Sequence, residues 1–151
     1  MKYLIIFLIF ISSNVFSQKN NNNNQMASNN IDKYFNTQLT EVERQNYYSQ
    51  IHDYSQELHK NPSPETYVNR GVAYAKLGLY PDAISDYNRA LRIDSLFSYA
   101  YYNRGLARAR FRYTKRSCMD IKKAYELGIT QSKQVYNENC GLFKRELGEL
   151  K

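Results

Sequence analysis

The chain of 151 residues holds few side chains whose types and spacing could support catalysis or metal binding. Its two histidines, His52 and His59, stand seven residues apart on a predicted helix. They share a helix face but lie about 10.5 Å apart along the axis. Two ligands of one metal ion on a helix need a spacing of three or four residues. We interpret both histidines as solvated surface residues and predict no metal site.

The sequence motifs that mark many enzyme active sites are also absent. The chain contains no glycine-rich phosphate loop, no nucleophile elbow and no zinc-type cysteine pairing. We therefore predict that it is not an enzyme, that it has no catalytic residues and that it needs no cofactor.

Cys118 and Cys140 are the two cysteines of the chain. They lie on predicted helices that should be neighbours. An even number of cysteines in an exported chain favours a disulfide, and the N-terminus described next favours export. The alternative is a pair of buried free thiols, with Cys118 at a core position.

Residues 1–17 have the layout of a secretory signal peptide. Lys2 supplies a positive start, residues 4–11 form an unbroken apolar run, and Val15 and Ser17 stand at the −3 and −1 positions of a cut before Gln18. A membrane anchor is the alternative, but a membrane span needs about 20 apolar residues. No cysteine lies near the cut, so no lipid anchor is expected. We predict an exported protein, periplasmic or secreted, with no integral membrane span after cleavage.

Residues 18–30 form an asparagine-rich stretch that we predict to be a disordered spacer. Beyond it, the composition favours helices. Six glycines and three prolines are too few for a many-turned β-sandwich or barrel, and an aromatic content of 15% argues against a wholly disordered chain.

Most of the remaining sequence repeats with a period of 34 residues. Asn69-Arg70-Gly71 recurs as Asn103-Arg104-Gly105. The same offset relates other positions, among them Asp86 with Asp120, Ala90 with Ala124, Ile84 with Cys118 and Tyr87 with Ile121. An offset of 33 extends the pattern upstream to a weaker copy, in which Asp53 matches Asp86. Because these aspartates recur with the repeat, we interpret them as architectural rather than catalytic.

Each copy is predicted to form two helices. In the middle copy, Ser63 is a suitable N-cap with Pro64 in the first turn, and Gly78 can end the first helix after Leu77. Pro81 opens a second helix with an apolar stripe made of Ala83, Ile84, Tyr87, Ala90 and Leu91. Neither helix could bury its apolar face alone, so neighbouring copies should stack.

These residues resemble the tetratricopeptide repeat. The middle copy, 63–96, matches the family's aromatic, glycine and small positions with Tyr67, Gly71, Tyr74, Ala83, Tyr87 and Ala90. The third copy, 97–130, keeps most of them, but Arg108 replaces the second aromatic. The first copy, 31–62, is degenerate and has Gln38 in place of glycine. The resemblance implies an all-α fold, a short right-handed α-solenoid of about three helix-turn-helix repeats. Residues 131–151 should form a capping helix and tail.

The first helix of each repeat in this family lines a concave groove that takes an extended peptide or a partner helix. The resemblance places these residues in such a groove: Glu65, Asn69, Val72, Lys76, Tyr99, Tyr102, Asn103, Leu106 and Arg110. The amides can hold a peptide backbone, the tyrosines offer contact area, and the cations attract carboxylates. Alternatively, Asn69 and Asn103 belong to the scaffold of the repeat. Val68 and Tyr102 stand where family members that grip a C-terminal carboxylate would profit from cations, so that activity is not expected.

A second candidate surface is basic, in keeping with the net charge of +7. Residues 104–123 contain one acid, Asp120, and a predicted basic patch made of Arg104, Arg108, Arg112, Lys115, Arg116, Lys122 and Lys123. Such a patch could attract an acidic protein or an anionic envelope polymer. The alternative is a solvated convex face. Nucleic acid is not expected, because no recognised binding motif is present.

The sequence thus predicts an exported adaptor that holds a protein or peptide, of unknown identity, in the groove of a short helical array. The alternative function is an envelope-associated module that binds an acidic protein or anionic polymer through the basic patch.

Overall fold

The structure, a computed structural model, describes residues 38–143. The predicted signal peptide, the 18–30 spacer, the start of the first copy and the tail beyond residue 143 lie outside the described residues. Within the described range the chain forms helices and no strand: α2 (Glu41–Lys60), α3 (Pro64–Lys76), α4 (Tyr80–Ile93), α5 (Ser98–Phe111), α6 (Lys115–Glu126), α7 (Gln131–Asn139) and the 3-10 helix η1 (Gly141–Phe143).

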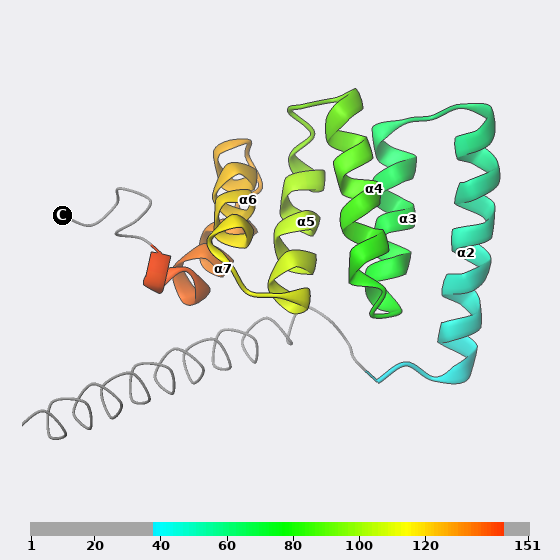
Figure 1. Ribbon diagram of the computed structural model, residues 1–151, viewed down its shortest axis with the longest axis horizontal. Coiled ribbons are helices and arrows are strands. Elements are labelled where there is room, and N and C mark those ends of the chain that lie inside the picture. The colour runs from blue at the N-terminus through cyan, green and yellow to red at the C-terminus, as the bar shows by residue number, and fades with distance from the viewer. Residues whose placement is uncertain (1–37, 144–151) are drawn as a thin grey trace, which may run out of the picture.

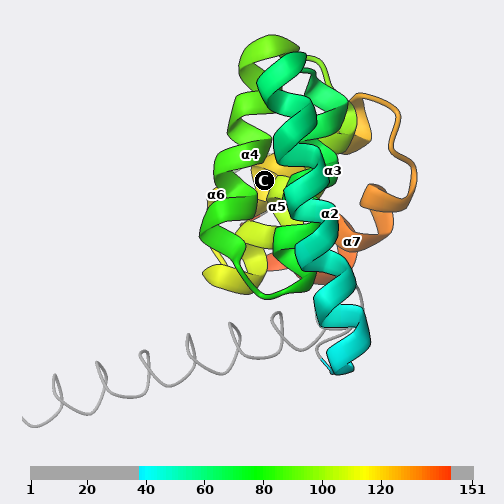
Figure 2. The ribbon, with the colours of Figure 1, turned by 90° about the vertical axis from the view of Figure 1, so that its right-hand side faces the viewer.

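The helices stack in a row, each against the next one along the chain (Figure 1). α3 pairs with α4 and α5 with α6, and α3 also contacts α5 directly. Seen along the row, α4 and α6 lie on one side and α3 and α7 on the other (Figure 2). The second helices α4 and α6 therefore share one side of the row. The prediction of an all-α helical-repeat fold is confirmed.

The middle repeat starts and stops as its residues predict. The hydroxyl of Ser63 accepts a hydrogen bond from the Thr66 backbone N–H at 3.1 Å, and Pro64 is the first residue of α3. Gly78 follows the helix with a φ of 77°, a conformation that costs glycine little. The turn is short enough for α4 to fold back onto α3.

The upstream copy differs from the two-helix expectation. α2 is continuous from 41 to 60, although an offset of 33 places the turn between two helices at residues 44–46. Thr40 and Glu43 form a capping box that starts the helix at Glu41. The residues at 44–46 (Arg-Gln-Asn) include no glycine or proline that would end it. α2 packs on α3 as one long helix, and Leu58 is its buried residue.

A glycine brings the two helices of each repeat into close contact. A Cβ atom on Gly71 would lie 2.6 Å from Cε1 of Tyr87, and one on Gly105 would lie 2.7 Å from Cγ1 of Ile121. The contacts are 34 residues apart in the sequence, so the predicted period corresponds to a repeated packing geometry. Tyr87 and Ile121 are fully buried and belong to the two core clusters of the described chain.

An arginine then ties each repeat to the helix before it. Arg70 donates from Nε and Nη2 to the two carboxylate oxygens of Asp86, at 2.7 and 2.8 Å, and from Nη1 to the Ser55 hydroxyl of α2 at 2.9 Å. One repeat later, Arg104 donates from Nε and Nη2 to the two carboxylate oxygens of Asp120, at 2.9 and 2.7 Å, and from Nη1 to the side-chain oxygen of Asn88 of α4 at 2.7 Å. We call this two-nitrogen contact of an arginine with a buried aspartate the arginine fork. Both aspartates are buried and hold helices together, as an architectural role requires.

Asp53, the third aspartate of the repeating set, is exposed on α2. It does not occupy the buried position that Asp86 and Asp120 share. The architectural interpretation therefore holds for Asp86 and Asp120, which are buried between helices, but not for Asp53, which is exposed.

The last helix closes the array with one buried face. Val135, Tyr136, Ser132 and Asn139 of α7 are buried, while most of its other residues are exposed. Cys118 of α6 and Cys140, at the end of α7, form a disulfide with both residues fully buried and Cα atoms 5.7 Å apart. The Tyr113 hydroxyl donates to the Asn139 carbonyl beside it. No helix among residues 38–143 is both long and apolar enough to cross a membrane.

Replacing Gly105 by alanine should destabilise the fold, although alanine is the better helix former. The added methyl would lie 2.7 Å from Cγ1 of Ile121 and 3.1 Å from two backbone atoms of α6, so α5 and α6 would have to separate. We expect the free energy of unfolding, measured by urea titration with circular dichroism, to fall by about 1–3 kcal/mol.

Gly141→Ala is the matched control, because nothing lies within 4 Å of its would-be Cβ atom. It should change the free energy of unfolding by less than about 0.5 kcal/mol. A Gly105→Ala protein as stable as this control would contradict the close contact between α5 and α6.

Candidate functional site

A hollow of about 190 Å³ lies where the first helices of two repeats meet. α3 contributes Val72, Ala75 and Lys76, α5 contributes Tyr102, Asn103 and Leu106, and α4 contributes Tyr87. We call it the α3/α5 hollow. It contains five of the nine predicted groove residues. Val72 and Leu106 occupy equivalent positions of successive repeats, so the hollow follows directly from the stacking of α3 beside α5.

Sequence reasoning missed two residues of the hollow, Ala75 and Tyr87. The sequence predicts Tyr87 in the apolar stripe of α4, and its ring is buried. Because Gly71 has no side chain, the ring lies directly against α3 and extends to the α3/α5 hollow. Burial, helped by the neighbouring charge of Asp86, raises the pKa of Tyr87, so its hydroxyl stays neutral. The sequence signal for this is Gly71: a helix position without a side chain allows a ring of the facing helix to reach across it.

The chemistry of the α3/α5 hollow is that of a small recognition site. Its base is apolar, with Leu106 buried and Val72 half-buried, and Lys76 places a cation in the lining. Asn103 donates one N–H to the Tyr99 carbonyl, four residues earlier in the same helix, at 2.9 Å. This bond belongs to the scaffold, yet it also holds the amide of Asn103 in one orientation beside the hollow.

The other four predicted groove residues do not line the α3/α5 hollow. Glu65 and Asn69 are exposed on α3, and Tyr99 is exposed at the start of α5. Arg110 donates to the Tyr80 hydroxyl at 3.2 Å and lies over its ring at 5.9 Å. Its guanidinium is thus held against the first turn of α4 and does not line the hollow.

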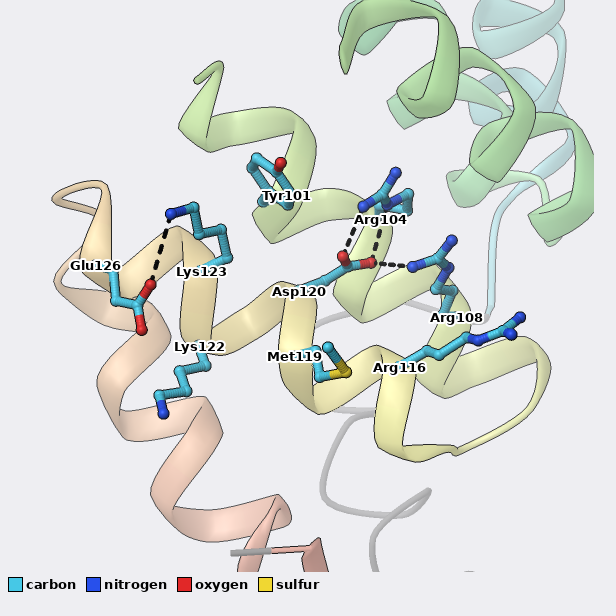
Figure 3. Close-up of a pocket in the computed structure, with 9 residues that line it drawn as sticks. All are labelled: Tyr101, Arg104, Arg108, Arg116, Met119, Asp120, Lys122, Lys123 and Glu126. Carbon is cyan, nitrogen blue, oxygen red and sulfur yellow. Dashed lines mark hydrogen bonds and ion pairs between the residues drawn. The ribbon is translucent and has the colours of Figure 1, made fainter. Parts of the chain in front are cut away.

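The predicted basic patch lies around two adjoining hollows, which together we call the basic groove. The first, about 490 Å³ between α5 and α6, contains five cations and two carboxylates (Figure 3): Arg104, Arg108, Arg116, Lys122, Lys123, Asp120 and Glu126, with Tyr101 and Met119. The second, about 640 Å³, shares Arg108, Arg116 and Met119 with it. It extends over Arg112, Lys115, Thr114 and Phe111 to Ile84 of α4.

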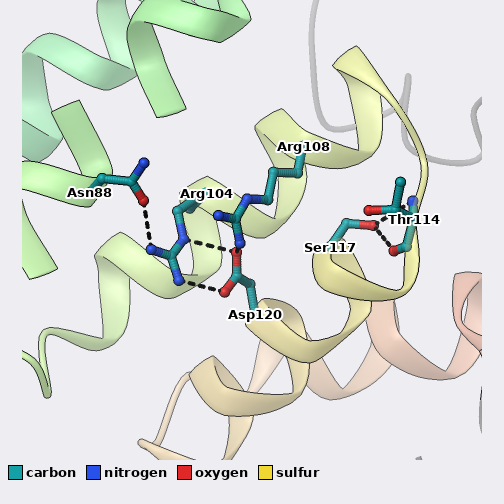
Figure 4. Close-up of polar contacts among 6 residues, drawn as sticks. All are labelled: Asn88, Arg104, Arg108, Thr114, Ser117 and Asp120. Atoms are coloured by element: carbon teal, nitrogen blue, oxygen red, sulfur yellow. Dashed lines mark hydrogen bonds and ion pairs between the residues drawn. The ribbon is translucent and has the colours of Figure 1, made fainter. Parts of the chain in front are cut away.

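Several cations of the basic groove are paired with its carboxylates. Arg104 and Arg108 converge on Asp120, while Asn88 holds the far side of Arg104 (Figure 4). Lys123 lies 3.7 Å from Glu126. Burial lowers the pKa of Arg108, and the charges of Arg104 and Arg116 also lower it, against the attraction of Asp120. The patch is therefore a partly compensated cluster rather than seven solvated charges.

The histidines lie apart from both surfaces. His52 and His59 are exposed on α2, in agreement with their interpretation as surface residues. Among residues 38–143, no group of three or more His, Cys, Asp or Glu side chains is arranged to hold a metal ion.

Sequence comparisons find partial relatives. Residues 64–95 match the family model of the tetratricopeptide repeat. Protein SGT1 homolog of Oryza sativa subsp. japonica is 27% identical over 100 residues, which are 64% of this chain and 27% of that protein. Hsp70-Hsp90 organizing protein 3 of Arabidopsis thaliana is 29% identical over 83 residues, which are 48% of this chain and 15% of that protein. The chain thus spans less than a third of the length of either relative.

Two solved structures share the arrangement of helices. The TPR2B-domain:pHsp70-complex of yeast Sti1 matches with a TM-score of 0.57 and 20% identity, over 76% of this chain and 97% of that one. The first TPR of Spaghetti (RPAP3), bound to the HSP90 peptide SRMEEVD, matches with a TM-score of 0.59 and 22% identity, over 80% and 94%. At these identities the likeness establishes the fold. The chain therefore has an all-α helical-repeat fold, in which residues 64–95 match the model of the tetratricopeptide repeat.

Proposed function

We propose that the chain is an exported, non-catalytic adaptor that binds an extended peptide of a partner protein in the α3/α5 hollow. The observation that carries this proposal is the hollow itself, where two first helices present an apolar base, a cation and a fixed amide side by side. Of the two solved structures with the same fold, one is a pHsp70 complex and the other is bound to an HSP90 peptide, which supports peptide binding as the activity.

The α3/α5 hollow favours an internal peptide segment over a chain end. Val68 is buried, and Tyr102 stands at the other position where a cation would help to hold a terminal carboxylate. Among the described residues that line the hollow, Lys76 is the one cation. The matching ligand has an apolar side chain that enters between Val72 and Leu106 and a neighbouring acidic residue that pairs with Lys76.

The export part of the proposal rests on the leader sequence, residues 1–17, and on the cysteines. A disulfide between Cys118 and Cys140 persists in oxidising compartments and is rare in the cytosol. The buried pair that joins α6 to the end of α7 is therefore what an exported chain of this fold would retain.

Substitutions in the α3/α5 hollow should weaken peptide binding. Peptides would be selected from a phage-displayed random library on the purified protein and re-measured in solution by isothermal titration calorimetry. Tyr102→Ala should raise Kd about tenfold, because it removes a rigid contact surface, and Lys76→Glu should do the same for peptides with an acidic residue.

Tyr125→Ala is the control for these measurements, since it removes an exposed tyrosine from α6 that does not line the hollow. Its Kd should stay within about twofold of the unsubstituted protein. Selected peptides that bind all three variants equally well would show that the hollow is not the binding site.

One mass measurement tests export and oxidation together. The full chain would be expressed in a bacterium with a secretion pathway, and the protein recovered outside the cytoplasm would be treated with an alkylating agent without reductant. The expected mass is that of a chain starting at Gln18 with an intact disulfide and no added alkyl group. A chain that keeps Met1, or one that carries two alkylated thiols, would contradict the export proposal.

A further inference from the structure

The repeat at 63–96 provides an internal reference for the repeat at 97–130. At the position of Tyr74 the later repeat has Arg108, and at the position of Asp82 it has Arg116, each 34 residues on. The two helix pairs share their glycine contact and their arginine fork. Since the fold accepts an aromatic residue and an acid at these two positions, the architecture does not require the two arginines.

The two arginines leave positive charge in excess at Asp120. In the earlier repeat, Asp86 is forked by Arg70 and approached at 3.8 Å by the exposed Arg89. Asp120 is forked by Arg104 and also accepts from Arg108 at 2.6 Å, with Arg116 beside them in the same hollow. One carboxylate cannot compensate three guanidinium groups. An additional anion would be stabilised by charge-assisted hydrogen bonds.

Exposed apolar side chains lie among these cations. Met119 is 51% exposed and Phe111 is 61% exposed, and both line the basic groove together with Ile84. A polyphosphate has no apolar groups to cover them, and an anionic sugar polymer offers only the C–H faces of its rings. A peptide with both acidic and apolar side chains matches the charge and the apolar surface at once.

We propose that the basic groove is a second binding site, which takes an acidic and partly apolar peptide segment of a partner protein. Its carboxylates accept hydrogen bonds from Arg108 and Arg116, and its apolar side chains pack on Met119 and Phe111. The site goes beyond the proposed function, because the basic groove shares no lining residue with the α3/α5 hollow.

The test uses a fluorescein-labelled peptide of sequence ELEFELE, blocked at both ends, with fluorescence anisotropy as the readout on the purified protein. The two variants introduce the residue types that the earlier repeat has at the equivalent positions. Arg116→Asp matches Asp82, and Arg108→Tyr matches Tyr74. Both substitutions are of kinds that the fold already accepts. Each should raise Kd about tenfold, as expected for one lost charge-assisted contact. Binding by the unsubstituted protein should weaken as salt rises from about 0.05 to 0.5 M.

Arg92→Glu is the matched control. Arg92 is exposed on α4, and the later repeat has Glu126 at the same position, so the substitution changes the net charge as much as Arg116→Asp does. The control should keep Kd within about twofold. Tyr102→Ala in the α3/α5 hollow should also leave ELEFELE binding unchanged, which separates failure of this site from failure of the proposed function.

Three results would overturn the proposal. The first is equal binding by Arg116→Asp and by the unsubstituted protein, and the second is an equal loss in Arg92→Glu, which would mean attraction by net charge alone. The third concerns the chemistry of the ligand. The groove does not recognise an acidic peptide if the uncharged peptide QLQFQLQ binds as well as ELEFELE. The same follows if tripolyphosphate binds more tightly than the peptide and depends on Arg116 in the same way.

Discussion

The arginine fork is the interaction on which the rest of this structure depends. A buried aspartate is costly to desolvate, and the cost is offset only when both of its oxygens meet well-placed donors. Arg70 and Arg104 meet that requirement for Asp86 and Asp120, and the third nitrogen of each arginine bonds to the helix before. One side chain thus holds three helices. The glycine contacts let the helices come close enough for the fork to reach.

Both candidate binding surfaces follow from this constraint. Because each repeat is locked to its neighbour, α3 and α5 lie side by side at a set spacing, and their equivalent residues Val72 and Leu106 face one hollow. On the α6 side of α5, the fork leaves Asp120 within reach of the next turn, where Arg108 replaces an aromatic residue and adds its charge. The scaffold is common to the two repeats, and the differences between them create the basic groove.

Much of the fold was predictable from the sequence because the period identifies equivalent positions. Ser63, Gly78 and the glycine-aromatic spacing placed α3 and α4, and the recurrence of Asp86 and Asp120 indicated their architectural role. A period does not tell which atoms a long side chain reaches. The sequence places Arg104 in a basic patch but does not show that it also donates to Asp120, and it does not show that Arg110 reaches Tyr80, thirty residues away. In the upstream copy, α2 begins at a cap formed by Thr40, a local feature that the period does not encode.

A double-mutant cycle on Arg104 and Asp120 tests the central claim most directly. Arg104→Gln, Asp120→Asn and the double variant would be compared with the unsubstituted protein by urea unfolding. The same cycle on the exposed pair Lys123 and Glu126 would serve as reference. The account predicts a coupling free energy of about 2 kcal/mol or more for the fork and under about 0.5 kcal/mol for the exposed pair. A coupling for Arg104 and Asp120 no larger than that of the exposed pair would contradict it.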